Sequence, residues 1–497
     1  MTDGWQRLDP RTLATQPFAI AAKSLVPALA GFVGVGSAIG FGLALPLTVA
    51  GVVAVGAIPW LTTTYRITGT HLEVRRGLLN RTTVTARLDR VRSVDLEADV
   101  FHRVLRVTKV AVGTGVDESR LDLDSLDVDE AERLRVALLH GSPDAVSAGA
   151  SDAVAPAPGS PAQEIAGLDW SWLRFAPLNI GNLAIALAAI GAVASQFDAF
   201  IDSERVESVW DWLQASDLPL VVGITLVAGL VLWVPAACVG YAVRWFGLRV
   251  TREQGKEGPT LRRVHGLFTQ RATTVEEAKV RGVVVRRSAL VGLAGGADLR
   301  VLTTGLADNE PHVLPSSPRA VVESVAADVL GDAEALVAPA TPHGRRARRR
   351  ALFHHLRQAL YAVLAAVVLT WALGTWGVDR PLWLPPTVAV AAVPVALVAA
   401  ELRYRRLGHA LTEHYLVSCT GTLTATRTAL EADGIVGWRL RQSFWDRRLG
   451  LAQLTAATAA GGEQVLVADV PLGEAVAVAA AATPRMVEGF LPTEDWA

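Results

Sequence analysis

The sequence contains few of the residues on which metal and thiol chemistry depend. Its 497 residues include two cysteines and ten histidines. Cys238 falls in an apolar stretch and Cys419 in a strand-like run far along the chain, so we expect neither a disulfide framework nor a cysteine metal site. His354 and His355 are adjacent and cannot share one helix face for a metal, and no HExxH occurs. We therefore expect no metal and no cofactor.

The motifs of the common enzyme classes are also absent. The sequence contains no P-loop, no nucleophile elbow and no Cys/His pairing. The 47 basic and 48 acidic residues give a net charge of −1, which offers no overall attraction to nucleic acid. We predict a protein that is not an enzyme, with no catalytic, cofactor-binding or metal-binding residues and no nucleic-acid partner.

Long apolar runs are present instead. Hydrophobic residues make up 51% of the chain and charged residues 19%, and the apolar excess is concentrated in blocks. A bilayer crossing needs about 20 apolar residues. Six segments, in three pairs, meet this length: Phe18–Phe41, Leu43–Thr62, Leu178–Ser195, Leu218–Tyr241, Leu356–Thr375 and Leu382–Ala400. The sequence therefore predicts three transmembrane hairpins.

The interiors of these spans carry almost no ionisable residues. Lys23 and Arg357 lie near span ends, and no other acidic, basic or histidine side chain occurs at depth. Transport pathways and intramembrane active sites place such groups inside the bilayer. The pattern argues against an ion-coupled transporter and against an intramembrane enzyme.

Charge at the span ends predicts the orientation. Basic residues flank each pair on the side of the polar segments, whereas the connection Gln196–Asp217 carries six acids and only Arg205. Positive residues stay on the cytoplasmic side. We expect a multi-pass protein of the bacterial cell membrane, with both termini and all three polar segments in the cytoplasm.

Each polar segment is patterned as short strands followed by a helix. In the first, the expected strands are His71–Arg75, Thr82–Leu88, Val91–Leu96 and Val104–Val112, followed by a helix that Asp127 caps and that ends at Leu139. Later helices are expected from Ser317-Pro318 to Leu330 and from about Glu474 to Ala482. The order Ile435–Trp438 then Trp445–Leu449 matches Val91–Val94 then Phe101–Leu105 at the same spacing. These similarities indicate one unit used three times.

On these residues the chain resembles the membrane-flanked bacterial PH-like domain proteins of the YdbS/YdbT type. The resemblance rests on the paired spans, on Tyr65-Arg66-Ile67-Thr68 at the start of a β region, and on Ser443–Leu451. It covers nearly the whole chain in a three-unit, YdbT-like layout. It implies a PH-like fold of antiparallel strands with a C-terminal helix, and no established enzymatic activity.

The expected fold is an α+β membrane protein. Six transmembrane helices in three hairpins alternate with three PH-like antiparallel β-barrel modules, each closed by a C-terminal helix. The expected domains are an N-terminal tail with the first span pair at 1–62, PH-like domain 1 at 63–140, a disordered linker at 141–168, the second span pair with an outer amphipathic loop at 169–243, PH-like domain 2 at 244–331, a linker with an arginine cluster at 332–350, the third span pair at 351–402, and PH-like domain 3 at 403–497.

The arginine cluster is the candidate site. Its members are Arg345, Arg346, Arg348, Arg349 and Arg350. A basic cluster at a membrane surface attracts anionic headgroups by about 1 kcal/mol per residue. The same charges also set topology, and both interpretations stay open.

The sequence leaves two functions in competition. The first is an interaction platform at the cytoplasmic face, which contacts the bilayer and a membrane or cytoplasmic protein, including a second YdbS-type protein or another copy of the chain. The second is a component of an export or permease system, which would need a polar path through the spans.

Overall fold

The computed structural model describes most of the polar part of the chain. The described residues are 5–7, 11, 61–68, 71–77, 81–87, 93–113, 121–140, 163–179, 218–255, 258–304, 311–375 and 380–487. Two compact units are present. Unit 1 comprises Met1–Asp169, Gly240–Val280 and Thr304–Asn309, and unit 2 comprises Trp170–Val239, Arg281–Thr303 and Glu310–Ala497.

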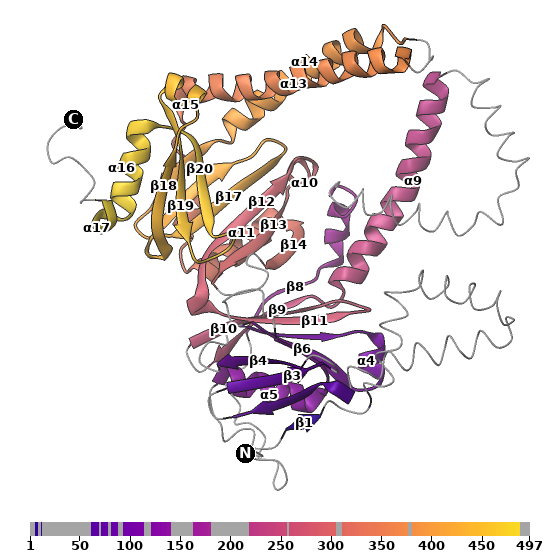
Figure 1. Cartoon of the computed structure of the whole chain (residues 1–497), viewed down its shortest axis with the longest axis vertical. Coiled ribbons are helices and arrows are strands. Elements are labelled where there is room, and N and C mark those ends of the chain that lie inside the picture. The colour runs from indigo at the N-terminus through magenta and orange to yellow at the C-terminus, as the bar shows by residue number, and fades with distance from the viewer. Residues whose placement is uncertain are drawn as a thin grey trace, which may run out of the picture. The chain divides into compact units, whose positions relative to one another are not determined.

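Unit 1 contains two antiparallel sheets (Figure 1). The first has the order β1 (Gln6–Arg7), β2 (Thr64–Ile67), β3 (His71–Arg76) and β4 (Thr82–Arg87). The second has the order β7 (Leu121–Asp127), β6 (Val107–Gly113), β5 (Ser93–Ala98), β11 (Gln270–Glu276), β10 (Gly258–His265), β9 (Arg249–Gly255) and β8 (Gln163–Gly167). Its helices are α4 (Val100–Val104), α5 (Val128–His140) and the short turn η5 (Glu277–Lys279).

Unit 2 also contains two sheets. The six-stranded sheet has the order β14 (His312–Pro318), β13 (Gly296–Thr303), β12 (Val280–Ser288), β17 (Thr424–Glu431), β16 (Tyr415–Thr420) and β15 (Gly408–Leu411). The three-stranded sheet has the order β18 (Ile435–Arg441), β19 (Leu451–Thr458) and β20 (Gln464–Pro471). The helical elements are η2 (Trp170–Phe175), α10 (Ala289–Leu293), α11 (Arg319–Leu330), α12 (Glu334–Val337), α13 (Gly344–Thr375), α14 (Leu384–Arg405), η6 (Ala432–Gly434), α15 (Phe444–Leu449), α16 (Leu472–Ala482) and α17 (Pro484–Val487). Helix α9 (Leu218–Trp245) belongs to both units.

One order of elements occurs three times along the chain. Three strands are followed by a fourth strand, a short helix, two more strands and a longer helix. We refer to these runs as module 1 (64–140), module 2 (249–330) and module 3 (408–482). In each module the last two strands contain a β-bulge at the same place: Thr108–Val110, Ala297–Leu299 and Ala452–Leu454. A bulge bends the strand and increases its twist.

The sheets are open and are not separate closed barrels, which differs from the expected arrangement. The fourth strand of module 1, β5, pairs with β11 of module 2. The fourth strand of module 2, β12, pairs with β17 of module 3. Consecutive modules therefore share sheets because their edge strands satisfy one another's backbone hydrogen bonds.

Apolar side chains on the inner faces of the sheets form the cores. In unit 1, Tyr65, Leu72, Val94, Leu123 and Leu134 are buried in one cluster. The Tyr65 hydroxyl donates to Glu130 Oε1 at 2.6 Å and thereby ties β2 to α5. In unit 2, residues of β16 to β20 and α16 form a second cluster. In both, a helix covers a sheet face that is apolar.

Helices of membrane-spanning length match three of the predicted spans. Among the described residues, Val227–Trp245, Gly344–Thr375 and Leu384–Arg405 are long and apolar enough to cross a bilayer. They correspond to the predicted fourth, fifth and sixth spans. The predicted segments Phe18–Phe41, Leu43–Thr62 and Leu178–Ser195 lie almost wholly outside the described residues.

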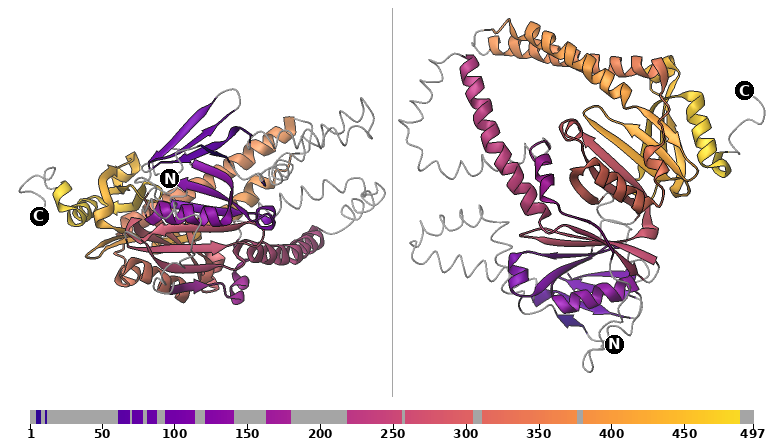
Figure 2. Two further views of the ribbon diagram at one scale, coloured as in Figure 1. Left: turned by 90° about the horizontal axis from the view of Figure 1, so that it is seen from below. Right: turned by 180° about the vertical axis from the view of Figure 1, so that it is seen from behind.

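Helices α13 and α14 lie side by side (Figures 1 and 2). The buried residues of α13 are small or polar and recur mainly every fourth position: Ala347, Ala351, His355, Ala359, Ala366 and Thr370. Those of α14 are Ala396 and Ala400. Small side chains allow two helix backbones to approach closely in a membrane. The larger apolar residues, such as Leu364 and Val395, point outward and are exposed.

Local predictions differ from the structure at two places. Val104, the first residue of the predicted strand Val104–Val112, ends α4, because the Asp99 carboxylate accepts the His102 N–H at 2.8 Å and caps a helical turn. Arg106, with φ of +55°, ends that turn before β6 begins. Helix α11 starts at Arg319 and its N-cap is Pro318, so Ser317 is not the cap. The Asp127 cap of α5 is confirmed by its bond to the Asp129 N–H.

Candidate functional site

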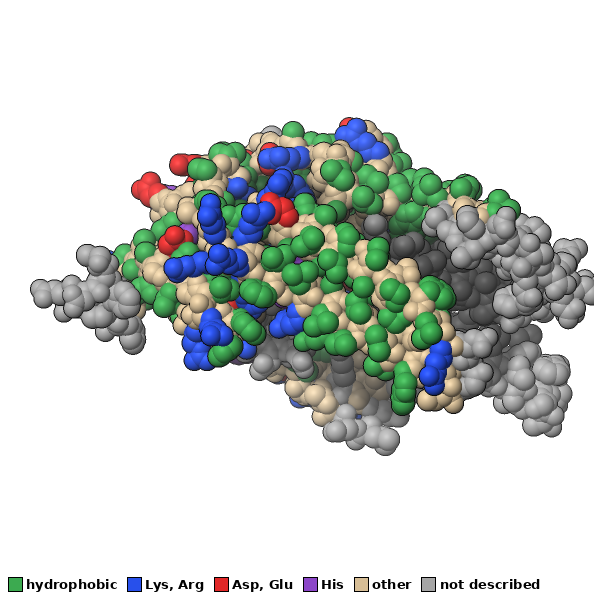
Figure 3. Space-filling model, turned by 90° about the horizontal axis from the view of Figure 1, so that it is seen from above, with side chains coloured by type: hydrophobic (Ala, Val, Ile, Leu, Met, Phe, Trp, Pro, Cys, Tyr) green, Lys and Arg blue, Asp and Glu red, His purple; other side chains and the backbone are tan. Residues whose placement is uncertain are grey.

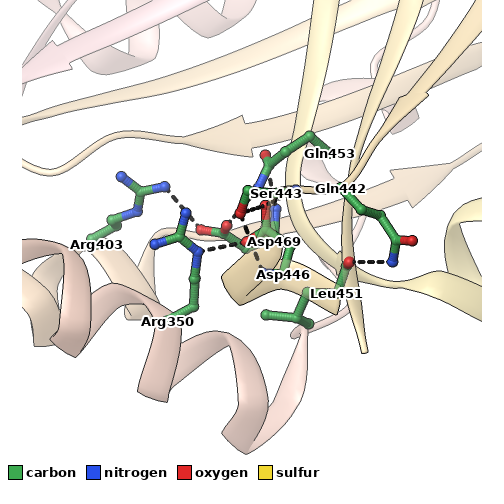
Figure 4. Close-up of polar contacts among 8 residues, drawn as sticks. All are labelled: Arg350, Arg403, Gln442, Ser443, Asp446, Leu451, Gln453 and Asp469. Atoms are coloured by element: carbon green, nitrogen blue, oxygen red, sulfur yellow. Dashed lines mark hydrogen bonds and ion pairs between the residues drawn. The ribbon is translucent and has the colours of Figure 1, made fainter. Parts of the chain in front are cut away.

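The candidate site is the joint between the helix pair α13–α14 and module 3 (Figure 4). Two arginines of the helices reach two carboxylates of the module. Arg350 Nε lies 2.6 Å from Asp446 Oδ1, and Arg403 Nη2 lies 2.8 Å from Asp469 Oδ2. The two carboxylates are almost completely buried. Removing one partner of a buried ion pair leaves an uncompensated charge, so the joint is sensitive to substitution of any one of these four residues.

Asp446 is positioned by the first turn of α15. The Ser443 hydroxyl and backbone N–H both donate to Asp446 Oδ2, at 2.6 and 3.1 Å, and the Asp446 N–H donates to Ser443 Oγ at 3.2 Å. This is a capping box. Burial favours the neutral acid, but hydrogen bonds from Ser443 and Arg350 outweigh that effect and lower the pKa of Asp446 below its ordinary value. The carboxylate therefore stays charged at neutral pH.

Asp469 lies in the bulge of β20, where Ala468 and Asp469 stand against Gln453 of β19. Its φ is +52°, a conformation uncommon outside glycine. Gln453 fixes the residue from both sides: its amide Nε2 donates to Asp469 Oδ1 at 2.7 Å, and its Oε1 accepts the Asp469 N–H at 3.2 Å. The bulge thus aims a carboxylate at Arg403 from the end of α14.

The arginine cluster divides into two groups. Arg350 is half-buried in the joint, and Arg348 pairs with Glu401 at 2.9 Å, where Arg405 also binds. Arg345, Arg346 and Arg349 are exposed and form no ion pair with any residue that the structure describes. The predicted lipid-contact residues therefore lie together at the start of α13, with three of the five free to meet an anion.

Aromatic side chains lie next to this cluster. Phe353 of α13 stacks on Trp445 of α15 with ring centroids 6.1 Å apart, and Phe444 meets the edge of Trp445 at 5.4 Å. All three are more than two-fifths exposed. Figure 3 shows one face of the molecule, with most of its basic side chains toward one end and hydrophobic side chains over much of the rest. Exposed aromatics beside arginines are typical of a protein surface at a membrane interface.

A cavity of about 410 Å³ opens beside the joint within unit 2. Its polar lining residues are Arg286, Arg403, Gln464, Ser418, Thr420, Thr422, Thr426 and Thr428. This lining can hydrogen-bond a small polar or anionic group. Among the described residues no group of three or more His, Cys, Asp or Glu side chains could hold a metal ion.

The sequence identified the arginines but not their partners. The acids that these arginines bind are Asp446, Asp469 and Glu401. Asp446 had a local signal, the spacing Ser443-x-x-Asp446 of a capping box, and Glu401 lies four residues before Arg405. Asp469 lies 66 residues from Arg403, and Glu401 lies 53 residues from Arg348. No spacing rule connects residues that far apart.

Comparison with known protein families gives one match. The Bacterial PH domain family matches residues 24–141 and 351–486, together about half of the chain. These regions contain modules 1 and 3, each with the segment that precedes it. No curated protein and no solved structure matches the chain. On this match, with its antiparallel sheets and closing helices, the chain belongs to the Bacterial PH domain family.

Proposed function

We propose that this chain is a multi-pass protein of the bacterial cell membrane that acts as an interaction platform and catalyses no reaction. Its three modules, module 2 included, are PH-like and face the cytoplasm in a YdbT-like layout. The observation that carries the proposal is the joint: buried Arg350–Asp446 and Arg403–Asp469 pairs fix a PH-like module to a helix pair of membrane-spanning length.

The geometry also supports contact with anionic lipid. A helix pair that crosses the bilayer would bring Arg345, Arg346 and Arg349 to the headgroup level, beside Phe353, Phe444 and Trp445. Three free arginines near an anionic surface contribute on the order of 3 kcal/mol together. Arg350 is engaged with Asp446 in the joint, and Arg348 pairs with Glu401 between α13 and α14.

The lipid proposal is tested by melting the full-length protein in detergent with and without added phosphatidylglycerol. A ligand that binds only the folded state raises the melting temperature. We expect a rise of several degrees, and a smaller rise after Arg345, Arg346 and Arg349 are all changed to Gln. The matched control changes three exposed arginines elsewhere, Arg103, Arg133 and Arg485, to Gln and should retain the full rise. Equal responses in both triple variants would contradict headgroup contact at the cluster.

The platform role is tested by crosslinked pull-down from native membranes. A platform should yield a defined partner, or further copies of the chain, in stoichiometric amounts. An export or permease component would instead co-purify with a transport machine. Recovery of the folded chain alone after crosslinking in its membrane would contradict the platform role.

A further inference from the structure

The two shared sheets join modules by the same strand pairing. In both, the fourth strand of one module pairs antiparallel with the third strand of the next: β5 with β11 and β12 with β17. Turn glycines with φ of +108°, +114° and +116° (Gly77, Gly266 and Gly421) give a common reference for the third strands. The cap residues Asp99, Ser288 and Ser443, which precede the short helices, give one for the fourth strands.

Counted from the turn glycine and from the cap residue, the two strand pairings have the same register. Arg271 and Thr426 each lie five residues after the turn glycine, and Glu97 and Arg286 each lie two before the cap residue. Arg271 is paired with Glu97, and Thr426 with Arg286. A one-residue slip would turn every side chain to the other face of the sheet. The pairing of a fourth strand with the third strand of the next module is therefore a specific contact that this chain uses twice.

Two strands of the series have no such partner. Strand β4, the third strand of module 1, ends its sheet, and β18, the fourth strand of module 3, ends another. No described strand lies on the outer edge of either. An edge strand presents unpaired backbone N–H and C=O groups and is a template for pairing.

The side chains of β18 also reflect the missing strand. Val283, Val284 and Val285 of β12 are at most 5% exposed, whereas Leu440, which corresponds to Val285, is 43% exposed. A Cβ atom built on Gly282 would lie 2.1 Å from the Ala429 carbonyl oxygen of the neighbouring strand. At Gly437, the corresponding position of β18, no atom of the described residues lies within 4 Å of such a Cβ. Beside β12, this space is filled by β17, the third strand of the next module. Beside β18, the same space is open.

The common register specifies how β18 and β4 would meet. Arg441 would lie opposite Thr82, the same residue types as the observed Arg286–Thr426 pair. Leu440 would lie opposite Thr83, and Trp438 opposite Thr85. Thr82, Thr83 and Thr85 are exposed in this structure.

We propose that β18 of one copy pairs with β4 of a second copy in this register, which continues the row of modules from chain to chain. The partner is another copy because the series ends with one free strand of each type, and the two types fit each other. Such a head-to-tail contact uses different surfaces on its two sides and builds rings or open rows. The proposal rests on the proposed function, since it names the partner of the platform.

The test is disulfide trapping in native membranes with the full-length chain. Cys238 and Cys419 are first replaced by Ala, because both are free thiols. One tagged copy carries Thr83→Cys and a differently tagged copy carries Leu440→Cys. We expect mild oxidation to produce an adduct of two chains that carries both tags, while either variant alone produces none. Directly opposed strand residues have Cβ atoms about 5 Å apart, within disulfide reach after small adjustment.

The matched control is Thr82→Cys with Leu440→Cys. Thr82 and Thr83 are exposed neighbours of the same type, but their side chains point to opposite faces of the strand. We expect at least ten-fold less adduct from this pair. Equal trapping of both pairs, an internal disulfide within one chain that carries both cysteines, or an adduct of Leu440→Cys with a different protein would each overturn the proposal. A lipid response retained without trapping would reject the strand contact while the platform stands.

Discussion

Asp446 connects α13 to module 3 through a buried ion pair. Its carboxylate is 2% exposed and meets Arg350 Nε at 2.6 Å while it also caps α15. We predict that Asp446→Asn lowers the free energy of unfolding by about 3 kcal/mol, because Arg350 is left half-buried without an anion. Thermal melting of the purified protein in detergent measures the change.

The control for this variant is Arg348→Gln. The Arg348 side chain is 62% exposed, so its pair with Glu401 is screened by water. We expect a loss below about 1 kcal/mol. Comparable losses in the two variants would show that the burial of Asp446 is not what makes the joint strong.

A buried histidine pair connects two elements near the same joint. His343, just before α13, and His409 of β15 lie 2.9 Å apart between Nε2 and Nδ1. Burial and the neighbouring His409 lower the pKa of His343 to about 4, and burial lowers the pKa of His409. Asp469 and Glu474 act in the opposite direction but do not reverse the shifts. Both imidazoles are therefore neutral at physiological pH.

This pair predicts acid sensitivity in a defined range. Below pH 6.5 the unfolded chain binds protons that the folded His343 does not, so stability falls as pH drops from 6.5 to about 4. We predict that His343→Gln reduces this fall, measured as melting temperature against pH. The control is Ser418→Ala, a buried polar side chain that carries no titrating group, which should leave the pH dependence unchanged. An unaltered profile in His343→Gln would assign the acid sensitivity to other groups.

The sequence predicted the helices and strands that depend on residues close together in the chain. Apolar length predicted α9, α13 and α14, and alternation with turn glycines predicted β3 and β4 to within a residue or two. The α4 turn was missed because Val104 continues an apolar run, and the Asp99 cap that decides the matter is a single side chain. The acids of the joint were missed because they meet their arginines only after the module has folded.

The orientation of the whole molecule in the membrane can be tested by thiol labelling. Leu423, in the turn between β16 and β17, is 67% exposed, and Trp383, at the start of α14, is 66% exposed. In a background without Cys238 and Cys419, an impermeant thiol reagent applied to intact cells should label Trp383→Cys and spare Leu423→Cys. Permeabilised cells should label both. Labelling of Leu423→Cys from outside would reverse the orientation that the basic residues predict.

Sharing of sheets could not be predicted at this scale. Each module has its own strand pattern, and nothing in that pattern states whether its third and fourth strands pair with each other or with neighbours. The choice is made by long-range pairing of Gln270–Val275 with Ser93–Ala98 and of Thr424–Leu430 with Gly282–Ser288. Periodicity within a strand carries no information about its partner.

The β5–β11 and β12–β17 pairings share one register, and this affects how the number of modules in such a chain can change. A third strand of the β11 type and one of the β17 type accept the same kind of neighbour at the same offset. Duplication or loss of one whole module would therefore present compatible edges at the new junction, with no surface to be redesigned.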